Sequence, residues 1–368
     1  MSDALHGLLA RHVETGTMPG AVASWGKDHH PISVGRDAPG GQPLRTDSIF
    51  RIQSMTKPVA AVAMLRLVQD GLIGLEDPIA AWMPELAEPR VLSRPDAALS
   101  DSEPAQTPIT VRHLLTNQSG FGVMTTDSPL KQAMVAAGVE AGAAPVALGA
   151  QDWLNALSAL PLAFEPGRGW RYHHSFGLLG ILLGRLGRGS TQRVLADTVF
   201  TPAGMADTGF SVPPAQAHRL IAAFRHRGEG FEESEPPGEG FYCAPPPFDV
   251  SHSELVSTLW DYHAFLRALL DGRLLSPEFR DELRSDQIPS GSKTAESFYP
   301  GFWESTGWGF GVSVVTGGPC RGRFGWSGGL GTDFFVDPDG RICIVMTQVE
   351  MNERVFGLLA ELHALGPV

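Results

Sequence analysis

Residues 48–71 read SIFRIQSMTKPVAAVAMLRLVQDG, in which a half-polar segment gives way to a long apolar one. Residues 49–52 mix apolar and polar side chains as a half-buried strand does. Residues 59–68 are apolar almost all round, which is typical of a buried helix, and Pro58 is tolerated in a first helical turn. The sequence therefore predicts a strand that leads directly into a buried helix.

A nucleophile and a candidate base lie in the turn between this strand and this helix. Ser54 and Lys57 are three residues apart, which on a helix places both on one face. A serine hydroxyl is a weak nucleophile that needs a neighbouring base. A lysine at the end of a buried helix serves as that base when loss of water lowers its pKa.

A serine here is also an ordinary helix N-cap, and the Ser-x-x-Lys pattern occurs four times in the chain. The copy at Ser24 runs off a predicted strand, where residues three apart point to opposite faces. The copy at Ser128 is typical of a helix start, and the copy at Ser290 lies in a Pro/Gly/Ser-rich loop. Only the Ser54 copy lies between a strand and a buried helix, so companion motifs must decide between catalysis and capping.

The overall composition is that of an ordinary globular protein. The chain has 368 residues, 43% of them hydrophobic and 18% charged, which allows one large domain or two domains that share a cleft. The formal charge of −12 argues against nucleic acid or an anionic membrane as a partner. No apolar stretch is long enough to span a membrane, and the first residues lack the pattern of a signal peptide. We therefore expect a cytoplasmic protein.

Cysteine and histidine patterns give no sign of a metal site. Cys243, Cys320 and Cys343 are widely spaced, which favours reduced, structural thiols. His173 and His174 are adjacent, but no acidic residue lies at helical spacing from them. We expect neither a metal nor another cofactor.

Strand patterns lie at both ends of the chain and helical patterns between them. A hairpin is expected at residues 21–35, further strands at 309–315, 332–336 and 341–347, and terminal helices at 5–13 and 353–365. The pattern predicts an α/β fold of the α+β type, with one antiparallel sheet built from both chain ends and flanked by helices, plus a mainly helical second lobe. The predicted boundaries are 1–78 with 290–368 for the sheet domain and 79–289 for the helical one. Residues 225–249 are expected to form a surface loop over the cleft.

Two further stretches are possible companions of Ser54. Tyr172 follows a Gly/Pro turn and precedes a buried helix, so its phenol can point into a cleft and shuttle a proton, although an ordinary half-buried tyrosine fits as well. Residues 325–332 read GWSGGLGT, where glycines permit close approach of a ligand and free N–H groups can point at an oxyanion. A β-bulge at a sheet edge explains the same glycines.

Taken together, these stretches resemble the serine β-lactamase and penicillin-binding-protein superfamily, most closely class C β-lactamases and family VIII carboxylesterases. Five segments occur in the family's order: FRIQSMTKPVAAVAMLRLVQDGLIGLEDPI, VRHLLTNQSGFG, PGRGWRYHHSFGLLG, SELVSTLWDYHAFLRALLDG and GWSGGLGTDFFVDPDG. The resemblance covers nearly the whole chain.

The resemblance implies a role for each motif. Ser54 would be the acylated nucleophile, Lys57 its activating neighbour, and Tyr172, from the family's Tyr-x-Asn element, the general base or acid. The N–H groups of Ser54 and Gly329 would form the oxyanion hole. The residues expected to bind substrate are Gln118, His174, Trp326, Ser327 and Gly328.

Two departures from the family pattern favour an ester as the substrate. His174 stands where Tyr-x-Asn has asparagine, and Trp326 stands where Lys-Thr-Gly has lysine. Loss of that lysine removes a cation that would attract the carboxylate of a β-lactam or a peptide. We therefore expect a carboxylesterase acting on a small-molecule ester. The alternatives are a β-lactamase, a D-amino-acid peptidase or amidase, an acyltransferase, or a catalytically idle binding module on the same fold.

A rival nucleophile is Ser327, because residues 325–329 match the Gly-x-Ser-x-Gly elbow of α/β-hydrolases. That elbow requires a strand before it, a helix after it, and then an acid and a histidine. Here the segment runs into a strand, and only His363 follows. We therefore expect Ser327 to line the cleft and to bind substrate.

Overall fold

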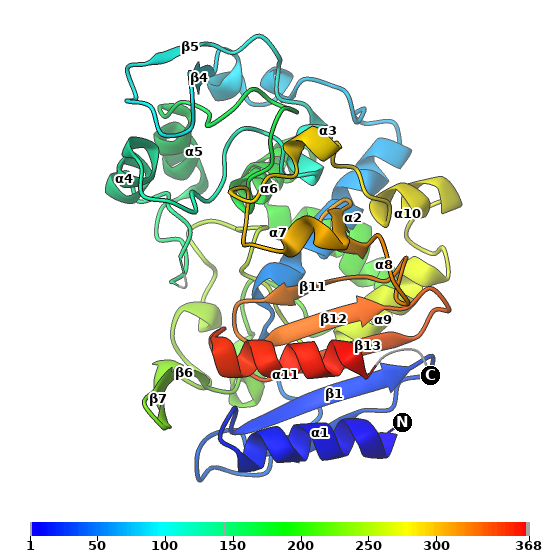
Figure 1. The fold of residues 1–368 in the computed structure, drawn as a ribbon. Coiled ribbons are helices and arrows are strands. Elements are labelled where there is room, and N and C mark those ends of the chain that lie inside the picture. Colours follow the sequence, from blue (N-terminus) through cyan, green and yellow to red (C-terminus); the bar gives the residue numbers. More distant parts are fainter. Residues whose placement is uncertain (1, 143, 366–368) are drawn as a thin grey trace.

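The computed structural model of the chain describes residues 2–142 and 144–365. A seven-stranded antiparallel sheet occupies one end of the molecule and helices with long connections occupy the other (Figure 1). The strands are β1 (Gly20–Gly26), β2 (Ile32–Gly35), β3 (Phe50–Arg51), β4 (Arg90–Leu92), β5 (Ser102–Pro104), β6 (Ala223–Arg227), β7 (Gly230–Glu235), β8 (Val256–Ser257), β9 (Thr306–Trp308), β10 (Ser313–Val315), β11 (Phe324–Gly328), β12 (Thr332–Val336) and β13 (Ile342–Met346). The helices are α1 (Ser2–Glu14), α2 (Thr56–Gln69), α3 (Val111–Leu115), α4 (Pro129–Ala136), α5 (Ala150–Ser158), α6 (His174–Leu186), α7 (Thr191–Leu195), α8 (Thr201–Ala203), α9 (Leu259–Leu270), α10 (Pro277–Leu283) and α11 (Glu353–Ala364). The predicted fold class is confirmed.

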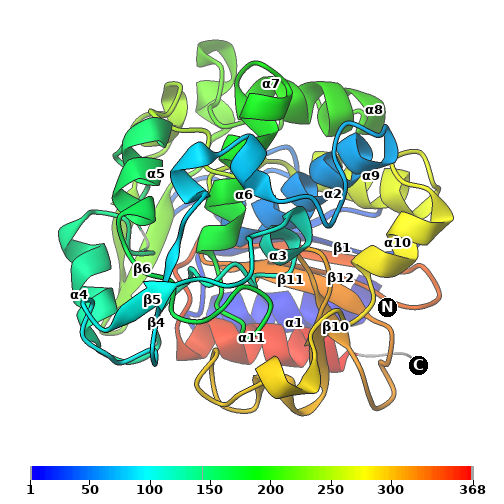
Figure 2. The ribbon, with the colours of Figure 1, turned by 90° about the horizontal axis from the view of Figure 1, so that it is seen from above.

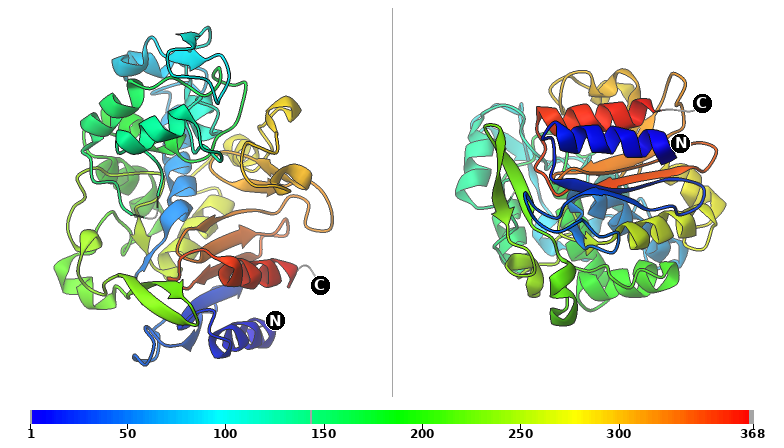
Figure 3. Two further views of the ribbon diagram at one scale, coloured as in Figure 1. Left: turned by 60° about the vertical axis from the view of Figure 1, so that its left-hand side comes forward. Right: turned by 90° about the horizontal axis from the view of Figure 1, so that it is seen from below.

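The main sheet joins the two ends of the chain. Its strand order is β2-β1-β13-β12-β11-β10-β9, and β1 pairs with β13 so that Ala23 lies opposite Val345. Successive side chains of a strand point to opposite faces, so each strand contributes to two apolar layers. Helices α1 and α11 lie side by side on one face (Figure 3) and bury their leucines there.

The opposite face of the sheet carries the central helix of the molecule. Residues of α2 from Val59 to Leu65 are fully buried, as their all-round apolar pattern predicts. Helix α6 packs against α2, next to which it lies in the view from above (Figure 2), and α9 packs on β1 and β13. One apolar core therefore runs from the sheet into the helical lobe, and the boundaries between the two predicted domains stay a prediction.

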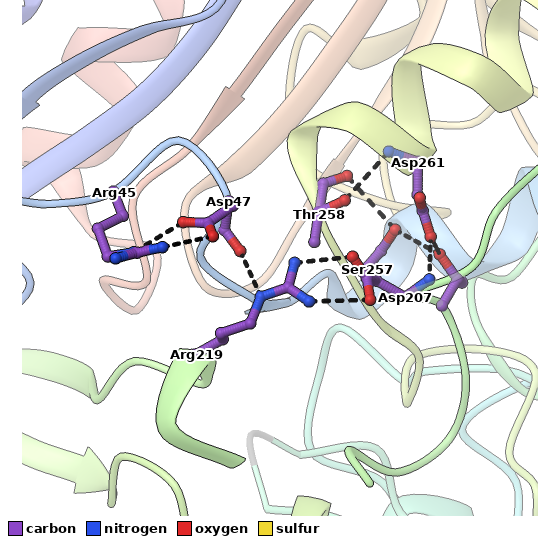
Figure 4. A network of polar contacts seen from close by, with 8 residues as sticks. Arg45, Asp47, Asp207, Arg219, Ser257, Thr258 and Asp261 are labelled. Carbon is purple, nitrogen blue, oxygen red and sulfur yellow. Dashed lines mark hydrogen bonds and ion pairs between the residues drawn. The ribbon is translucent and has the colours of Figure 1, made fainter. Parts of the chain in front are cut away.

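The strand predicted just before Ser54 is short and belongs to a separate pair. β3 pairs with β8, which places Phe50 opposite Ser257. A polar network supports this pair from one side (Figure 4). Arg219 donates two hydrogen bonds to the Asp207 carboxylate, at 2.9 and 2.7 Å, and one to the backbone oxygen of Asp47 at 2.9 Å, while Asp261 accepts from the Asp207 N–H at 2.7 Å. The network ties the chain before β3 to the start of α9.

Two of the predicted elements differ in the structure. Residues 225–249 are not a plain loop, because β6 and β7 form a hairpin within residues 223–235. Of the strand expected at 309–315, only residues 313–315 are a strand, β10. Residues 309–312 form the turn that joins β9 to β10, and Gly311 in this turn has φ +76°. A side chain at Gly311 would lie 3.0 Å from the Lys57 backbone oxygen, so this turn packs closely on the start of α2.

No helix within residues 2–142 and 144–365 combines the length and apolarity that crossing a membrane requires.

Candidate active site

Ser54 lies in a one-turn 3₁₀-helix, Gln53–Met55, that joins β3 to α2. Gln53 has φ +48°, a left-handed conformation that costs energy in a residue other than glycine. Helix α2 begins at the next residue, Thr56, so Lys57 lies in the first turn of that helix. The Lys57 Nζ atom is 3.0 Å from the Ser54 Oγ atom. The predicted pair is therefore in hydrogen-bonding contact.

Among the described residues, the amine of Lys57 has no charged partner. The side chain is fully buried, its Nζ donates to the backbone oxygen of His252, and it lies 4.4 Å from the centre of the Tyr172 ring. Burial alone lowers the pKa of Lys57 well below its ordinary value. A neutral amine in this position has a lone pair that can accept the Ser54 proton.

Tyr172 lies at the end of the connection that leads into α6, and its hydroxyl faces the same pair. Its Oη contacts the Ser54 hydroxyl and accepts a hydrogen bond of 2.6 Å from the indole Nε1–H of Trp326. Burial raises the pKa of Tyr172 above its ordinary value, against the opposing effect of these two hydrogen bonds. The phenol is therefore protonated at neutral pH and can act as a proton donor.

An aromatic cluster holds the Tyr172 ring in place. Its members lie within ring-contact distance of Tyr172, from 5.2 to 6.1 Å between centroids: Trp170, Phe298, Trp308 and Trp326. These side chains come from segments far apart in sequence. The structure thus brings Ser54, Lys57 and Tyr172 together, and their catalytic roles stay a prediction.

The glycine stretch after β11 lies against the Ser54 turn. A Cβ atom on Gly328 would lie 2.3 Å from the backbone oxygen of Ile52 and 2.2 Å from Thr332 Oγ1, so only glycine fits. Gly329 follows, and a Cβ there would lie 3.8 Å from Gln53 Oε1. Among the described residues, neither the Ser54 nor the Gly329 N–H has a hydrogen-bond acceptor. Both N–H groups are therefore available to an oxyanion, the role the resemblance implies for them.

The Ser327 hydroxyl is engaged with Asp333, and its expected part in binding substrate stays a prediction. Alternation along β11 turns Ser327 to the face opposite Trp326, where its Oγ donates to Asp333 Oδ1 at 2.6 Å. The other oxygen of Asp333 lies 2.9 Å from the His363 Nε2 atom on α11. The acid thus stands between the serine and the histidine, whereas a nucleophile elbow needs the histidine in contact with the serine. The geometry disfavours the rival nucleophile.

Gln118 and His174 are buried and engaged with the backbone. Gln118 Nε2 donates to the Gly167 oxygen at 3.3 Å, and His174 Nε2 lies 2.8 Å from the Val139 oxygen. Burial lowers the pKa of His174 to about 4, so its ring is neutral at pH 7. These hydrogen bonds fix the loops that surround the site. Binding of substrate by either side chain stays a prediction.

A cavity of about 410 Å³ lies beside the Ser54 centre, and sequence reasoning did not find it. His252 lines it, as does His173, which follows Tyr172; the centres of the two rings are 3.8 Å apart. His173 has φ +97°, a conformation rare outside glycine. In the sequence, the cavity is marked by no more than the polar residues 251–254. They do not reveal that the backbone oxygen of His252 accepts a hydrogen bond from Lys57.

No three His, Cys, Asp or Glu side chains in the described part of the chain gather closely enough to hold a metal ion.

Comparison with known proteins shows the family and the fold of this chain. The family model described as Beta-lactamase matches residues 5–364. An uncharacterized protein of Mycobacterium tuberculosis is 32% identical over 352 residues, which cover 90% of this chain and 86% of the relative. Esterase EstB of Burkholderia gladioli is 29% identical over 326 residues, which cover 82% of this chain and 77% of EstB. The solved structure of EstCE1, a hydrolase with promiscuous acyltransferase activity, shares the fold with a TM-score of 0.82 at 20% identity, covering 98% of this chain and 97% of EstCE1.

Proposed function

The chain belongs to the Beta-lactamase family, within the β-lactamase-fold serine hydrolase superfamily that includes esterases and acyltransferases, and we propose that it hydrolyses small-molecule carboxylic esters through an acyl-enzyme on Ser54. The observation that carries the proposal is the contact of 3.0 Å between the Ser54 hydroxyl and a buried lysine amine that has no counter-ion in residues 2–142 and 144–365. A neutral amine in that position is a base ready to take the serine proton.

In the proposed first step, Ser54 Oγ attacks the ester carbonyl carbon and its proton passes to Lys57 Nζ. The tetrahedral oxyanion accepts hydrogen bonds from the Ser54 and Gly329 N–H groups, and each such donor is worth roughly 3–4 kcal/mol of barrier. The bond to the alcohol oxygen then breaks. That oxygen takes the Tyr172 proton, and Lys57 returns a proton to Tyr172.

Water completes the cycle by attacking the acyl-enzyme carbonyl. The Lys57–Tyr172 pair takes the proton of the water, the bond to Ser54 Oγ breaks, and Ser54 regains its proton as the carboxylic acid leaves. The directions of the two pKa shifts support this division of roles, since a lowered lysine pKa favours the acceptor and a raised tyrosine pKa favours the donor.

Two features support an ester over a β-lactam or a peptide. Trp326 places a neutral indole where related β-lactamases carry a lysine, so the cleft lacks that cation for a substrate carboxylate. The relative EstB is named an esterase and is similar along most of its length. The same acyl-enzyme can also pass its acyl group to an alcohol, so adding a competing alcohol to the assay distinguishes transfer from hydrolysis.

The test is incubation with a p-nitrophenyl alkylphosphonate, followed by intact-protein mass spectrometry and peptide mapping. We expect one adduct, on Ser54, and turnover of p-nitrophenyl esters with little hydrolysis of nitrocefin. Ser54→Ala should abolish both adduct and turnover while its circular dichroism spectrum stays unchanged. An adduct on Ser327, or turnover that survives in Ser54→Ala, would refute the proposal.

A further inference from the structure

The turn that carries Ser54 contains a backbone conformation that its sequence does not favour. Gln53 has φ +48°, a left-handed conformation that glycine adopts freely and glutamine rarely does. The planar peptide between Gln53 and Ser54 carries the Ser54 N–H, so the dihedral angles of Gln53 decide where this proposed oxyanion donor points. Such a conformation persists where surrounding contacts fix it. The contacts of Gln53 therefore bear on catalysis.

Backbone oxygens on either side of Gln53 are anchored to other elements. Thr332 Oγ1 at the start of β12 donates to the Ile52 oxygen at 3.1 Å. Tyr262 Oη on α9 donates to the Met55 oxygen at 3.0 Å. These two bonds hold the ends of the turn, and the peptide in its middle needs a further contact.

The Gln53 side chain supplies that contact. Its Nε2 donates to the Tyr242 hydroxyl at 3.2 Å. Its Oε1 lies 3.8 Å from the position of a Cβ on Gly329 and is the only described heavy atom outside residues 328–330 within 4 Å of that position. The N–H of Gly329 is the second proposed oxyanion donor. One carboxamide thus bonds to Tyr242 and borders the segment that carries the second donor.

Tyr242 is itself held firmly. Its side chain is 2% exposed, and its backbone oxygen accepts the Val212 N–H at 2.7 Å. The Arg51 guanidinium lies 5.1 Å from the centre of its ring and donates to the backbone oxygens of Ile221 and Pro236, at 2.7 and 2.8 Å. Burial raises the pKa of Tyr242, so its hydroxyl stays protonated at neutral pH. The hydroxyl is therefore a fixed and uncharged anchor.

We propose that Gln53 is a positioning residue, whose carboxamide, held by the Tyr242 hydroxyl, directs the Ser54 N–H so that it shares one oxyanion with the Gly329 N–H. This inference rests on the proposed ester hydrolysis and adds to it the side chains that hold the oxyanion donors. The oxyanion forms in the transition state and is absent from the bound ester, so a misdirected donor lowers kcat and leaves KM nearly unchanged.

The test is Tyr242→Phe, which removes the hydroxyl and keeps the ring beside Arg51. We expect kcat for ethyl butyrate to fall about tenfold or more, a part of the roughly 10²–10³ that loss of an oxyanion donor costs, with KM within about twofold of wild type. A trifluoromethyl ketone of matching length forms a hemiketal oxyanion with Ser54, and its inhibition should weaken by the same factor as kcat. The inflection of the pH profile should not move, because Lys57 keeps its surroundings.

Two variants of Gln53 separate the bond to Tyr242 from the backbone conformation. Gln53→Met keeps the length of the side chain without the carboxamide and should lose as much kcat as Tyr242→Phe. The double variant should lose no more than either single one, because both remove the same bond. Gln53→Asn adopts the left-handed conformation more readily but is one methylene shorter, so it too should lose kcat. Wild-type kcat in Gln53→Asn, or losses that multiply in the double variant, would overturn the proposal.

Tyr299→Phe is the matched control, because Tyr299 is exposed and its hydroxyl has no hydrogen-bond partner in the part of the chain that the structure describes. It should keep kcat within about twofold. A lower melting temperature of Tyr242→Phe with unchanged kcat would show that the bond only stabilises the fold, and would overturn the proposal.

A second readout covers the case in which wild type turns over no ester, which would refute ester hydrolysis. The rate at which the p-nitrophenyl alkylphosphonate modifies Ser54 then replaces kcat, because the phosphonyl oxygen needs the same two N–H groups. A rate about tenfold lower in Tyr242→Phe would support the positioning role. Equal rates in the two proteins, or no modification of Ser54 in wild type, would overturn it.

Discussion

Replacing Trp326 by phenylalanine tests whether the indole N–H assists the proton transfer by Tyr172. In the structure this N–H donates to the Tyr172 oxygen at 2.6 Å, which is a short hydrogen bond. When Tyr172 gives its proton to the leaving alcohol, negative charge develops on that oxygen and the hydrogen bond becomes charge-assisted. Phenylalanine keeps most of the aromatic contact and removes only the donor.

The expected loss follows from the strength of such a bond. A hydrogen bond to a charged group contributes about 1.5–3 kcal/mol. If the bond is at full strength only in the transition state, kcat falls by roughly 10- to 150-fold while KM changes little. The measurement is the steady-state hydrolysis of ethyl butyrate across pH, followed by titration of the acid released, because the ethoxide leaving group needs a proton.

Trp303→Phe is the matched control. The Trp303 Nε1–H donates to Ser297 Oγ at 2.7 Å, so the change removes the same kind of bond from the same aromatic region without touching Tyr172. It should leave kcat within about threefold of wild type. Equal losses in both variants would refute the reasoning, because they would show that packing and not the bond to Tyr172 is responsible. An unchanged kcat in Trp326→Phe would refute it as well.

Three further perturbations test the site and its surroundings. Lys57→Arg puts a permanent cation in place of an amine whose pKa burial lowers, and should lower kcat/KM at least 100-fold. In wild type, kcat/KM should fall with decreasing pH through an inflection well below the ordinary lysine pKa, as steady-state pH profiles will show. Ser327→Ala should retain turnover within about twofold, since its hydroxyl faces Asp333; a loss approaching that of Ser54→Ala would revive the elbow interpretation. Burial raises the pKa of Glu254 from 4.5 to about 7, so the folded state binds a proton that the unfolded chain releases. Its contribution to the free energy of unfolding is complete below pH 4.5 and declines by roughly 3 kcal/mol as pH rises through 7, and urea unfolding of Glu254→Gln should lack this decline.

Several features of this protein follow from local sequence patterns. The run of apolar residues after Pro58 has no polar face, so the helix that it forms has to be buried, and it is. Ser54 and Lys57 are three residues apart at the start of that helix, so their contact needs little beyond the local backbone. Alternating apolar strands at both ends of the chain likewise predict one sheet with two covered faces, because each strand must bury its apolar side chains.

Other features depend on contacts between distant segments and have no local pattern. The bond between Trp326 and Tyr172 exists only because β11 and the connection before α6 meet over Ser54. The orientation of Ser327 could not be predicted from local sequence either. It depends on which face of β11 packs against α11, where Asp333 contacts both Ser327 and His363. The hairpin of β6 and β7 was missed because its charged residues resemble those of a loop.

The environment of charged groups was also decided by the tertiary structure alone. The sequence allows Lys57 to be a base. Its pKa is lowered because the fold buries the side chain away from water and places no carboxylate of the described residues beside it. Glu254 is one of many acidic residues in the chain, and its burial distinguishes it. Residue order determined which chemical groups are present and which helices and strands carry them. Packing determined which of those groups lost their water, and that loss shifts their pKa values.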